Sequence, residues 1–142
     1  MKPSPNAPCP CGSGAKLKQC CGVYHRGRPA TPPALMRARY SAYATGDANF
    51  LIDTTHPESP HAQADRRAWK QELVAYCRAT EFVGLTVHAH ERDDAAGRAS
   101  VTFTAALRQD GRDVSFTEHS TFVREGVRWY YLDGESIDAE LP

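Results

Sequence analysis

Four cysteines stand in two close pairs near the start of the 142-residue chain, Cys9 with Cys11 and Cys20 with Cys21. A structural zinc ion takes four thiolate or imidazole ligands in a tetrahedron. Paired ligands with a loop between them let a short segment close that geometry, and here eight residues separate the pairs. The spacing predicts a Zn²⁺ site with these four cysteines as ligands.

The alternatives to a metal site are disulfides and free thiols. Adjacent Cys20 and Cys21 can bond to each other only with strain, and cytosolic thiols stay reduced. Disulfides are therefore disfavoured, and four free thiols in a disordered tail are the remaining alternative.

Charge is unevenly distributed along the chain, although Lys+Arg and Asp+Glu are both 17. Residues 1–28 contain five basic residues and no acidic one, so the remainder has 12 basic and 17 acidic residues. A Pro-rich joint follows at Pro29, Pro32 and Pro33. This shift predicts a small basic metal-binding module over residues 1–28 and a globular domain over residues 29–142.

The cysteine segment Cys-Pro-Cys-Gly-Ser-Gly, followed by Lys-x-Cys-Cys, resembles the SEC-C motif, the zinc-binding tail of the bacterial translocation ATPase SecA. The last ligand of that motif is often His, whereas here it would be Cys21. Because the SecA tail binds the export chaperone SecB and contacts ribosomes, the resemblance implies a protein partner, either a SecB-like chaperone or the ribosome. Nucleic acid would then be met only through the ribosome.

Helical signals come first in the globular part. Thr31 can cap a helix with Pro32 at its first position, and Gly46 can end it. Asp47 can cap a short second helix, and a third starts near Asp65. This third helix carries an apolar stripe, expected to face the core, at Trp69, Leu73, Tyr76, Cys77 and Thr80.

After Glu81 the hydrophobic period becomes two. One face of the first strand is expected to carry Val83, Leu85, Val87 and Ala89. Asp110-Gly111 and Glu125-Gly126 are typical of turns between further strands. Helices followed by an antiparallel meander predict an α+β fold, with a curved sheet wrapped against helices.

This element order is similar to the NTF2-like (cystatin-like) cone. Five segments narrow the resemblance further, because their sequences look like those of the YchJ family of uncharacterised bacterial proteins. These segments are residues 36–40, 55–57, 82–86, 118–122 and 129–134. Longer members carry a second SEC-C motif after the last segment, and the sequence to Pro142 contains only the first. NTF2-like sheets often dimerise, so a homodimer is also expected from the resemblance.

Glu118 is the unusual residue of the predicted strands. Counting by two from Val114 and Phe116 places its carboxylate on the apolar face, where burial would raise its pKa and suit a general base. The alternatives are an ion pair with Arg37 or Arg39, and a bulge that turns Glu118 outward.

His56, beside Pro57 at a helix end, is a candidate acid or base near the mouth of the cone. It could equally cap a helix or bond a carbonyl. The other candidate pocket residues are Arg39, Tyr40, Tyr43, Trp69, Ser120, Trp129 and Tyr131. Of these, Trp129 and Tyr131 share a strand face with Val127 and are expected either to line the pocket or to belong to the core.

These features favour a zinc-binding adaptor whose basic metal-binding module docks a partner from the secretion or translation machinery. The alternative is a small-molecule binder or acid/base enzyme that uses the cavity of the cone. The N-terminus has no apolar segment of the secretory type, and no run approaches the ~18 apolar residues of a membrane span. A cytoplasmic location is therefore expected.

Overall fold

The main helices begin at side-chain caps in the computed structural model, which describes residues 4–137. The three helices are α2 (Pro32–Thr45), α3 (Ala48–Asp53) and α4 (Arg66–Ala79). Thr31 Oγ1, Asp47 Oδ1 and Asp65 Oδ1 each accept a hydrogen bond from the backbone N–H three residues on, at 3.1–3.4 Å. Gly46 ends α2 in the left-handed conformation, with φ of 76°. The caps predicted at Thr31 and Asp47, and the helix start predicted near Asp65, are thus confirmed.

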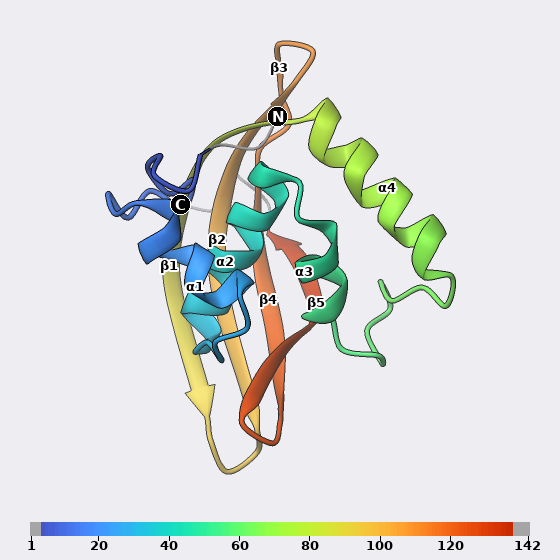
Figure 1. Ribbon diagram of the computed structural model, residues 1–142. Coiled ribbons are helices and arrows are strands. Elements are labelled where there is room, and N and C mark those ends of the chain that lie inside the picture. The colour runs from blue at the N-terminus through green and yellow to red at the C-terminus, as the bar shows by residue number, and fades with distance from the viewer. Residues whose placement is uncertain (1–3, 138–142) are drawn as a thin grey trace.

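The strands form one antiparallel sheet in the order β1-β2-β4-β5, with the short β3 paired to β2 (Figure 1). Their bounds are β1 Glu81–Asp93, β2 Arg98–Gln109, β3 Arg112–Asp113, β4 Phe116–Glu125 and β5 Arg128–Ile137. Asp110 and Gly111 both have positive φ, as a tight hairpin turn between β2 and β3 requires. Helices packed on a curved antiparallel sheet confirm the expected α+β class.

Helix α2 crosses one face of the sheet and supplies much of the core (Figure 1). Leu35, Met36 and Tyr40 belong to a buried cluster with sheet residues that include Val101 and Phe122. A short parallel bridge between Thr55 and Tyr131 also joins the loop after α3 to β5. Helices α2 and α3 and the inner face of the sheet therefore form one packed unit.

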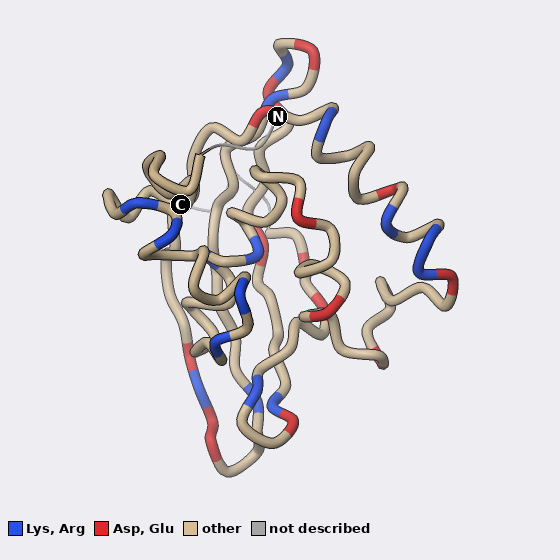
Figure 2. Tube along the Cα trace, viewed as in Figure 1, with Lys and Arg blue, Asp and Glu red and all other residues tan. Residues whose placement is uncertain are grey.

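Helix α4 lies to one side of that unit and diverges from the sheet (Figure 1). None of its residues is buried, and Tyr76 is 37% exposed. The stripe therefore does not pack into the core, whereas Trp69, expected to line a pocket, does line a cavity described below, together with Leu73 and Tyr76. The other residues of α4 include the basic residues Arg66, Arg67, Lys70 and Arg78 (Figure 2).

A bulge changes the first strand. The register of β1 against β2 shifts between Phe82 and Gly84, which leaves Val83 52% exposed. Phe82 packs against the core instead of Val83. The simple alternation predicted for this strand is therefore wrong at Val83. Of the helices that the structure describes, none has both the length and the apolar composition of a bilayer span.

Candidate metal centre and cavity

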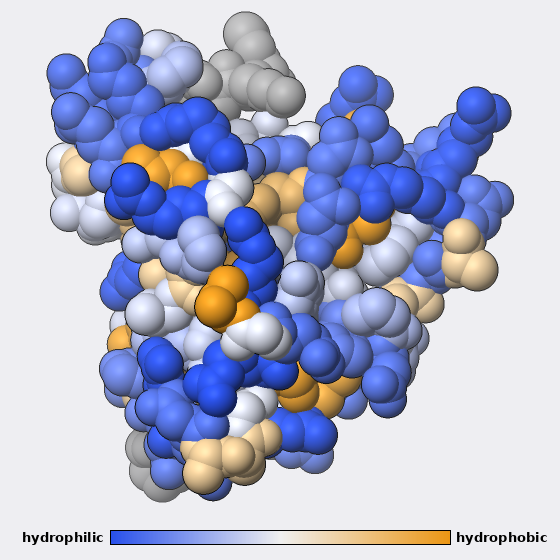
Figure 3. Space-filling model, turned by 60° about the horizontal axis from the view of Figure 1, so that its bottom comes forward, coloured by the Kyte–Doolittle hydropathy of each residue, from blue (hydrophilic) through white to orange (hydrophobic). Residues whose placement is uncertain are grey.

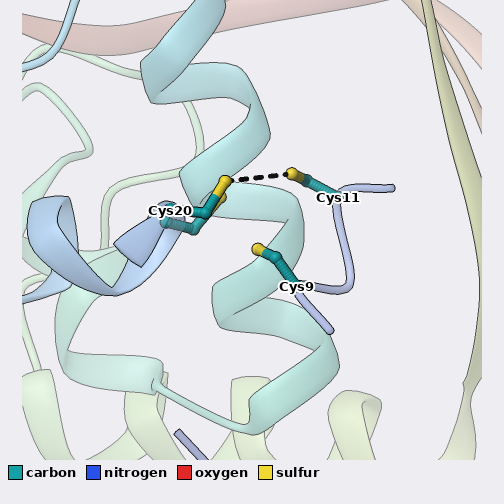
Figure 4. Close-up of side chains that lie close together, drawn as sticks. Cys9, Cys11 and Cys20 are labelled. Atoms are coloured by element: carbon teal, nitrogen blue, oxygen red, sulfur yellow. Dashed lines mark hydrogen bonds between the residues drawn. The ribbon is translucent and has the colours of Figure 1, made fainter. Parts of the chain in front are cut away.

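The four N-terminal cysteines converge on one point. Their sulfur atoms all lie within 4.8 Å of one another, and Cys11 Sγ is 3.6 Å from Cys20 Sγ (Figure 4). A tetrahedral ion with Zn–S bonds of ~2.3 Å would place its sulfurs about 3.8 Å apart. The cluster Cys9, Cys11, Cys20 and Cys21 therefore has the size and the donor set to hold a metal ion.

Local backbone structure brings the two pairs together. An isolated bridge joins Pro8 to Lys16, and Cys9 N–H donates to Ala15 O at 2.9 Å. Gly12 has a φ of 83°, which lets the chain turn directly after Cys11. The second pair is presented by a 3₁₀ turn, η1 (Leu17–Gln19), followed by α1 (Cys21–His25). We call this segment, residues 4–28, the knuckle.

The knuckle packs against α2. Cys9, Cys11, Cys21 and Leu17 form a buried cluster with Ala38 of that helix. Cys9 Sγ lies 3.4 Å from Ser41 Oγ, which is fully buried. The sulfurs thus face the domain, and the Pro-rich joint does not separate two independent bodies.

Two polar contacts fix the same interface. His25 Nε2 donates to Ala38 O at 2.8 Å, and Arg37 Nη1 donates to Cys11 O at 3.4 Å. The exposed side of the knuckle carries Lys16, Lys18 and Arg26. A metal ion held here would lie between a basic outer surface and α2.

The thiols share their protons unevenly. Hydrogen bonds from the Cys11 and Cys21 thiols hold the pKa of Cys9 far below its ordinary range. Hydrogen bonds with Cys11 and Cys9, together with burial, raise the pKa of Cys21. One sulfur of the cluster is thus readily a thiolate, which is the form that binds a metal.

A cavity of about 560 Å³ lies between the inner sheet face, α2 and α4. Its lining is largely aromatic and aliphatic. Seven of the candidate pocket residues line it: Arg39, Tyr40, Tyr43, Trp69, Glu118, Ser120 and Tyr131. This size falls within the 300–1,000 Å³ of typical ligand sites.

Glu118 points into this cavity. It pairs with Phe103 in the β2–β4 register, on the core face. Its Oε2 accepts hydrogen bonds from Ser120 Oγ at 2.5 Å and from Tyr131 Oη at 3.5 Å. Within residues 4–137 neither Arg37 nor Arg39 forms an ion pair with it. The expected arginine partner and the outward bulge are therefore both wrong.

Arg39 is a buried cation in the same cavity, with 7% of its surface exposed. Its Nη1 donates to Leu51 O at 3.0 Å, Thr54 Oγ1 at 2.7 Å and Thr55 Oγ1 at 3.2 Å. Its Cζ lies 4.5 Å from the centre of the Tyr131 ring. Burial lowers the pKa of Arg39, an effect that Tyr43, Tyr131 and Glu118 oppose.

Two candidate residues lie elsewhere. His56 is absent from the lining: its Nδ1 accepts from Glu58 N–H at 3.1 Å, so Nε2 carries the proton and donates to Glu125 Oε2 at 2.9 Å. Trp129 is buried in the core, with the guanidiniums of Arg92 and Arg124 each 5.3 Å from its ring. His56 is thus a structural hydrogen-bonding group, and Trp129 belongs to the core.

Sequence reasoning missed several residues at the cavity, among them the polar residues His61, Gln63 and Glu72. His61 lines it from the loop between α3 and α4, with Nε2 3.3 Å from Asp133 Oδ1. It follows Ser59 and Pro60 in an irregular segment, where no periodicity predicts which way a side chain points. Tyr40, by contrast, was a candidate, and its buried hydroxyl makes no hydrogen bond of ordinary geometry among the described residues.

Comparisons with known proteins agree with both parts of this structure. Residues 31–134 match the family described as the middle NTF2-like domain of YchJ, and residues 6–22 match the SEC-C motif.

Solved structures of two SEC-C motif containing proteins are similar to the chain. The solution structure from Rhodopseudomonas palustris is 34% identical, with 93% of this chain and 100% of that one covered and a TM-score of 0.76. The crystal structure from Psychrobacter arcticus is 26% identical, with 88% and 80% covered and a TM-score of 0.72. TsrD from Streptomyces laurentii, 19% identical over 74% of this chain and 85% of that one with a TM-score of 0.52, shares the fold alone.

Proposed function

Since the chain belongs to the YchJ-like family of NTF2-like proteins with a SEC-C motif, we propose that it is a small-molecule-binding protein built on a metal-clipped NTF2-like domain. The cavity beneath α4 binds the ligand, and the knuckle holds α2 in place behind it.

The observation that carries this proposal is the polar floor of the cavity. Glu118 and Arg39 both reach an aromatic-lined space, and neither is neutralised by an ion pair within the described part of the chain. A purely structural pair of charges would be expected to meet, because burying separated charges is costly. An apolar cavity with a few converging polar groups is the usual form of a ligand site.

Occupancy of the cavity can be tested with the neutral fluorescent probe N-phenyl-1-naphthylamine. Ser136 lines the cavity and is exposed, so Ser136→Trp should fill the space while the fold persists. Glu135→Trp, one residue earlier on the other face of β5, is the matched control. We expect the wild type and Glu135→Trp to enhance probe fluorescence, and Ser136→Trp to lose at least four-fifths of the enhancement. Equal enhancement in all three proteins would contradict a cavity site.

For the metal centre we propose zinc. Four thiolates in a tetrahedral arrangement, with no redox chemistry required, are the usual ligands of structural Zn²⁺. Elemental analysis of the purified protein should find about one zinc per chain. Cys20→Ser should lower that content severalfold, whereas Cys77→Ser, which changes a cysteine outside the cluster, should not. Iron or copper in place of zinc would overturn the assignment.

A second candidate function is docking through the knuckle, as the sequence led us to expect. The observation in its favour is the exposed basic set Lys16, Lys18, Arg26 and Arg28. On the face seen in Figure 3, hydrophobic residues form only small separate patches, so docking there would depend on charge. The proposed partners are a SecB-like chaperone and the ribosome.

Docking is tested by changing charge and leaving the cysteines intact. Lys16→Gln/Lys18→Gln should weaken co-sedimentation with purified bacterial ribosomes, or capture by a purified SecB-like chaperone, at least fivefold. Arg67→Gln/Lys70→Gln on α4 is the control with the same charge loss. Equal binding by both double variants would exclude the knuckle as the docking surface.

A further inference from the structure

The cavity displays a positive and a negative group side by side without joining them. Arg39 stacks over one side of the Tyr131 ring, and the hydroxyl of the same tyrosine reaches Glu118. No ion pair between Arg39 and Glu118 exists in residues 4–137. One ligand in contact with Tyr131 could therefore meet both charges at once.

Arg39 has donors to spare. All three of its hydrogen bonds leave from Nη1, whereas Nε and Nη2 donate to none of the described residues. The residue is 93% buried, because only 7% of its surface is exposed, and it lines the cavity. A buried guanidinium without a counter-ion is costly, and a carboxylate that accepts from two of its nitrogens is its best partner.

Glu118 has an acceptor to spare. Ser120 and Tyr131 both donate to Oε2, and Oε1 accepts from no residue in the described range. Gly134 faces this carboxylate, and a Cβ there would overlap it. The glycine thus makes room for the carboxylate itself, whose Oε1 has no donor among the described residues.

Besides the polar residues His61, Gln63 and Glu72, the last two of which are joined by a hydrogen bond from Gln63 Nε2 to Glu72 Oε2, the remaining lining suits an apolar group of moderate size. It includes the rings of Tyr43, Trp69, Tyr76, Phe82, Phe103 and Phe116. Aromatic walls also favour a nearby ammonium through their π faces. Charged anchors at one end and an aromatic sleeve beside them define a ligand with two opposite charges and an apolar body.

We propose that the cavity binds a zwitterion of the α-amino-acid kind with an apolar or aromatic side chain. Its carboxylate binds Arg39, its ammonium binds Glu118, and its side chain packs between α4 and the sheet. This inference rests on the proposed function, because it names the ligand class of the same cavity.

The ligand class can be tested on the wild-type protein alone, by comparing three related compounds. L-phenylalanine, 3-phenylpropanoate and 2-phenylethylamine share one ring and differ in their charges, and each is titrated into the wild type by calorimetry at pH 7. We expect L-phenylalanine to bind at least tenfold more tightly than either analogue. If 3-phenylpropanoate binds as tightly, the site takes anions and the zwitterion proposal fails. If 2-phenylethylamine does, the site takes cations and the proposal fails likewise.

A variant then assigns the ammonium contact. Glu118→Gln keeps the size of the side chain, and should weaken L-phenylalanine binding at least tenfold while leaving 3-phenylpropanoate within about twofold. Glu135→Gln, an exposed carboxylate on the same edge of the molecule, should change neither. Unchanged L-phenylalanine affinity in Glu118→Gln overturns the proposal.

Binding of the neutral naphthylamine probe distinguishes a failure of the zwitterion proposal from a failure of the proposed cavity site. If the probe binds the wild type and is excluded by Ser136→Trp, while none of the three phenyl compounds binds, the zwitterion class is wrong and the cavity site stands. If the probe shows no such difference, the proposed function itself fails.

Discussion

Gly134 and Glu118 depend on each other. A Cβ added to Gly134 would overlap the Glu118 carboxylate, and the φ of Gly134 lies outside the left-handed region. The glycine is therefore required by a neighbour's side chain and not by its own backbone conformation.

Gly134→Ala should consequently lower the free energy of unfolding by about 1–3 kcal/mol, the usual cost of overpacking. Urea denaturation measures it, and Gly84→Ala, where no atom lies within 4 Å of the added carbon, is the matched control. In a Glu118→Ala background the cost of Gly134→Ala should fall to a fraction of its value. A cost that persists without Glu118 would contradict this explanation.

For single residues, the sequence predicted the face to which a side chain points better than its distance from other side chains. Alternation from Phe116 correctly turned Glu118 toward the cavity. Its separation from Arg39 was not predictable, because it depends on how far α2 lies from β4, which long-range packing decides. The placement of Trp129 in the core follows from the same packing.

Among the elements, α2 and α4 have equal length and very different burial. Helix α2 has most of its residues buried, whereas α4 has none. An ion pair between Arg66 and Asp53, 2.9 Å apart and more than half exposed on both sides, helps to hold the start of α4. Such pairs contribute little, typically below about 1 kcal/mol.

Local opening should therefore occur first in α4. We expect backbone amides near Leu73 to exchange with solvent at least about 100-fold faster than those near Ala42 in α2. Hydrogen exchange followed by mass spectrometry or NMR resolves the two helices. Equal protection would mean that α4 opens only with the whole domain.

Helix starts were predictable because caps are local. Thr31, Asp47 and Asp65 each act on a backbone amide three residues away. The bulge in β1 was not predictable from the sequence. It shifts the register of the strand at Val83, and the composition of the strand does not reveal such a shift. The apolar stripe on α4 was real, but periodicity does not distinguish a side that faces a core from one that faces a cavity.

Over the whole molecule, the knuckle connects distant parts of the chain. Its cysteines share a buried cluster with α2, and Arg128 at the start of β5 donates to Gly27 O at 2.7 Å. A metal ion bound in the knuckle would therefore support more than the segment that supplies its ligands.

Metal removal should accordingly destabilise the entire domain. A zinc chelator under reducing conditions is expected to lower the Tm by about 10 °C or more, in one cooperative transition, and added zinc should restore it. Cys77→Ser should respond as the wild type does. A domain whose Tm is insensitive to the chelator would show that the knuckle is a passenger.

Alkaline pH should destabilise the fold as well. Burial raises the pKa of Tyr40 to about 12 and raises the pKa of Tyr43. Because tyrosine in the unfolded chain ionises near ~10, the unfolded state holds fewer protons than the folded state between these values. Stability is therefore complete below about pH 10 and falls as pH rises toward 12.

Urea denaturation from pH 8 to pH 11.5 measures this slope. Tyr40→Phe should flatten it and leave stability at pH 8 nearly unchanged, since the hydroxyl that it removes has no hydrogen bond of ordinary geometry among the described residues, only a contact with the backbone of Gly84. A stability that stays constant to pH 11.5 in the wild type would contradict the assignment.

The knuckle precedes the sheet in the chain, and this order has a consequence for synthesis. Its four cysteines lie between Cys9 and Cys21, so this small unit leaves the ribosome before any strand of the sheet. The helix that covers its sulfurs follows at once, whereas the strand that carries Arg128 emerges last. Domains begin to fold as they are made. A metal ion bound by these cysteines would thus be in place before the sheet exists, and α2 would pack first against the loaded knuckle.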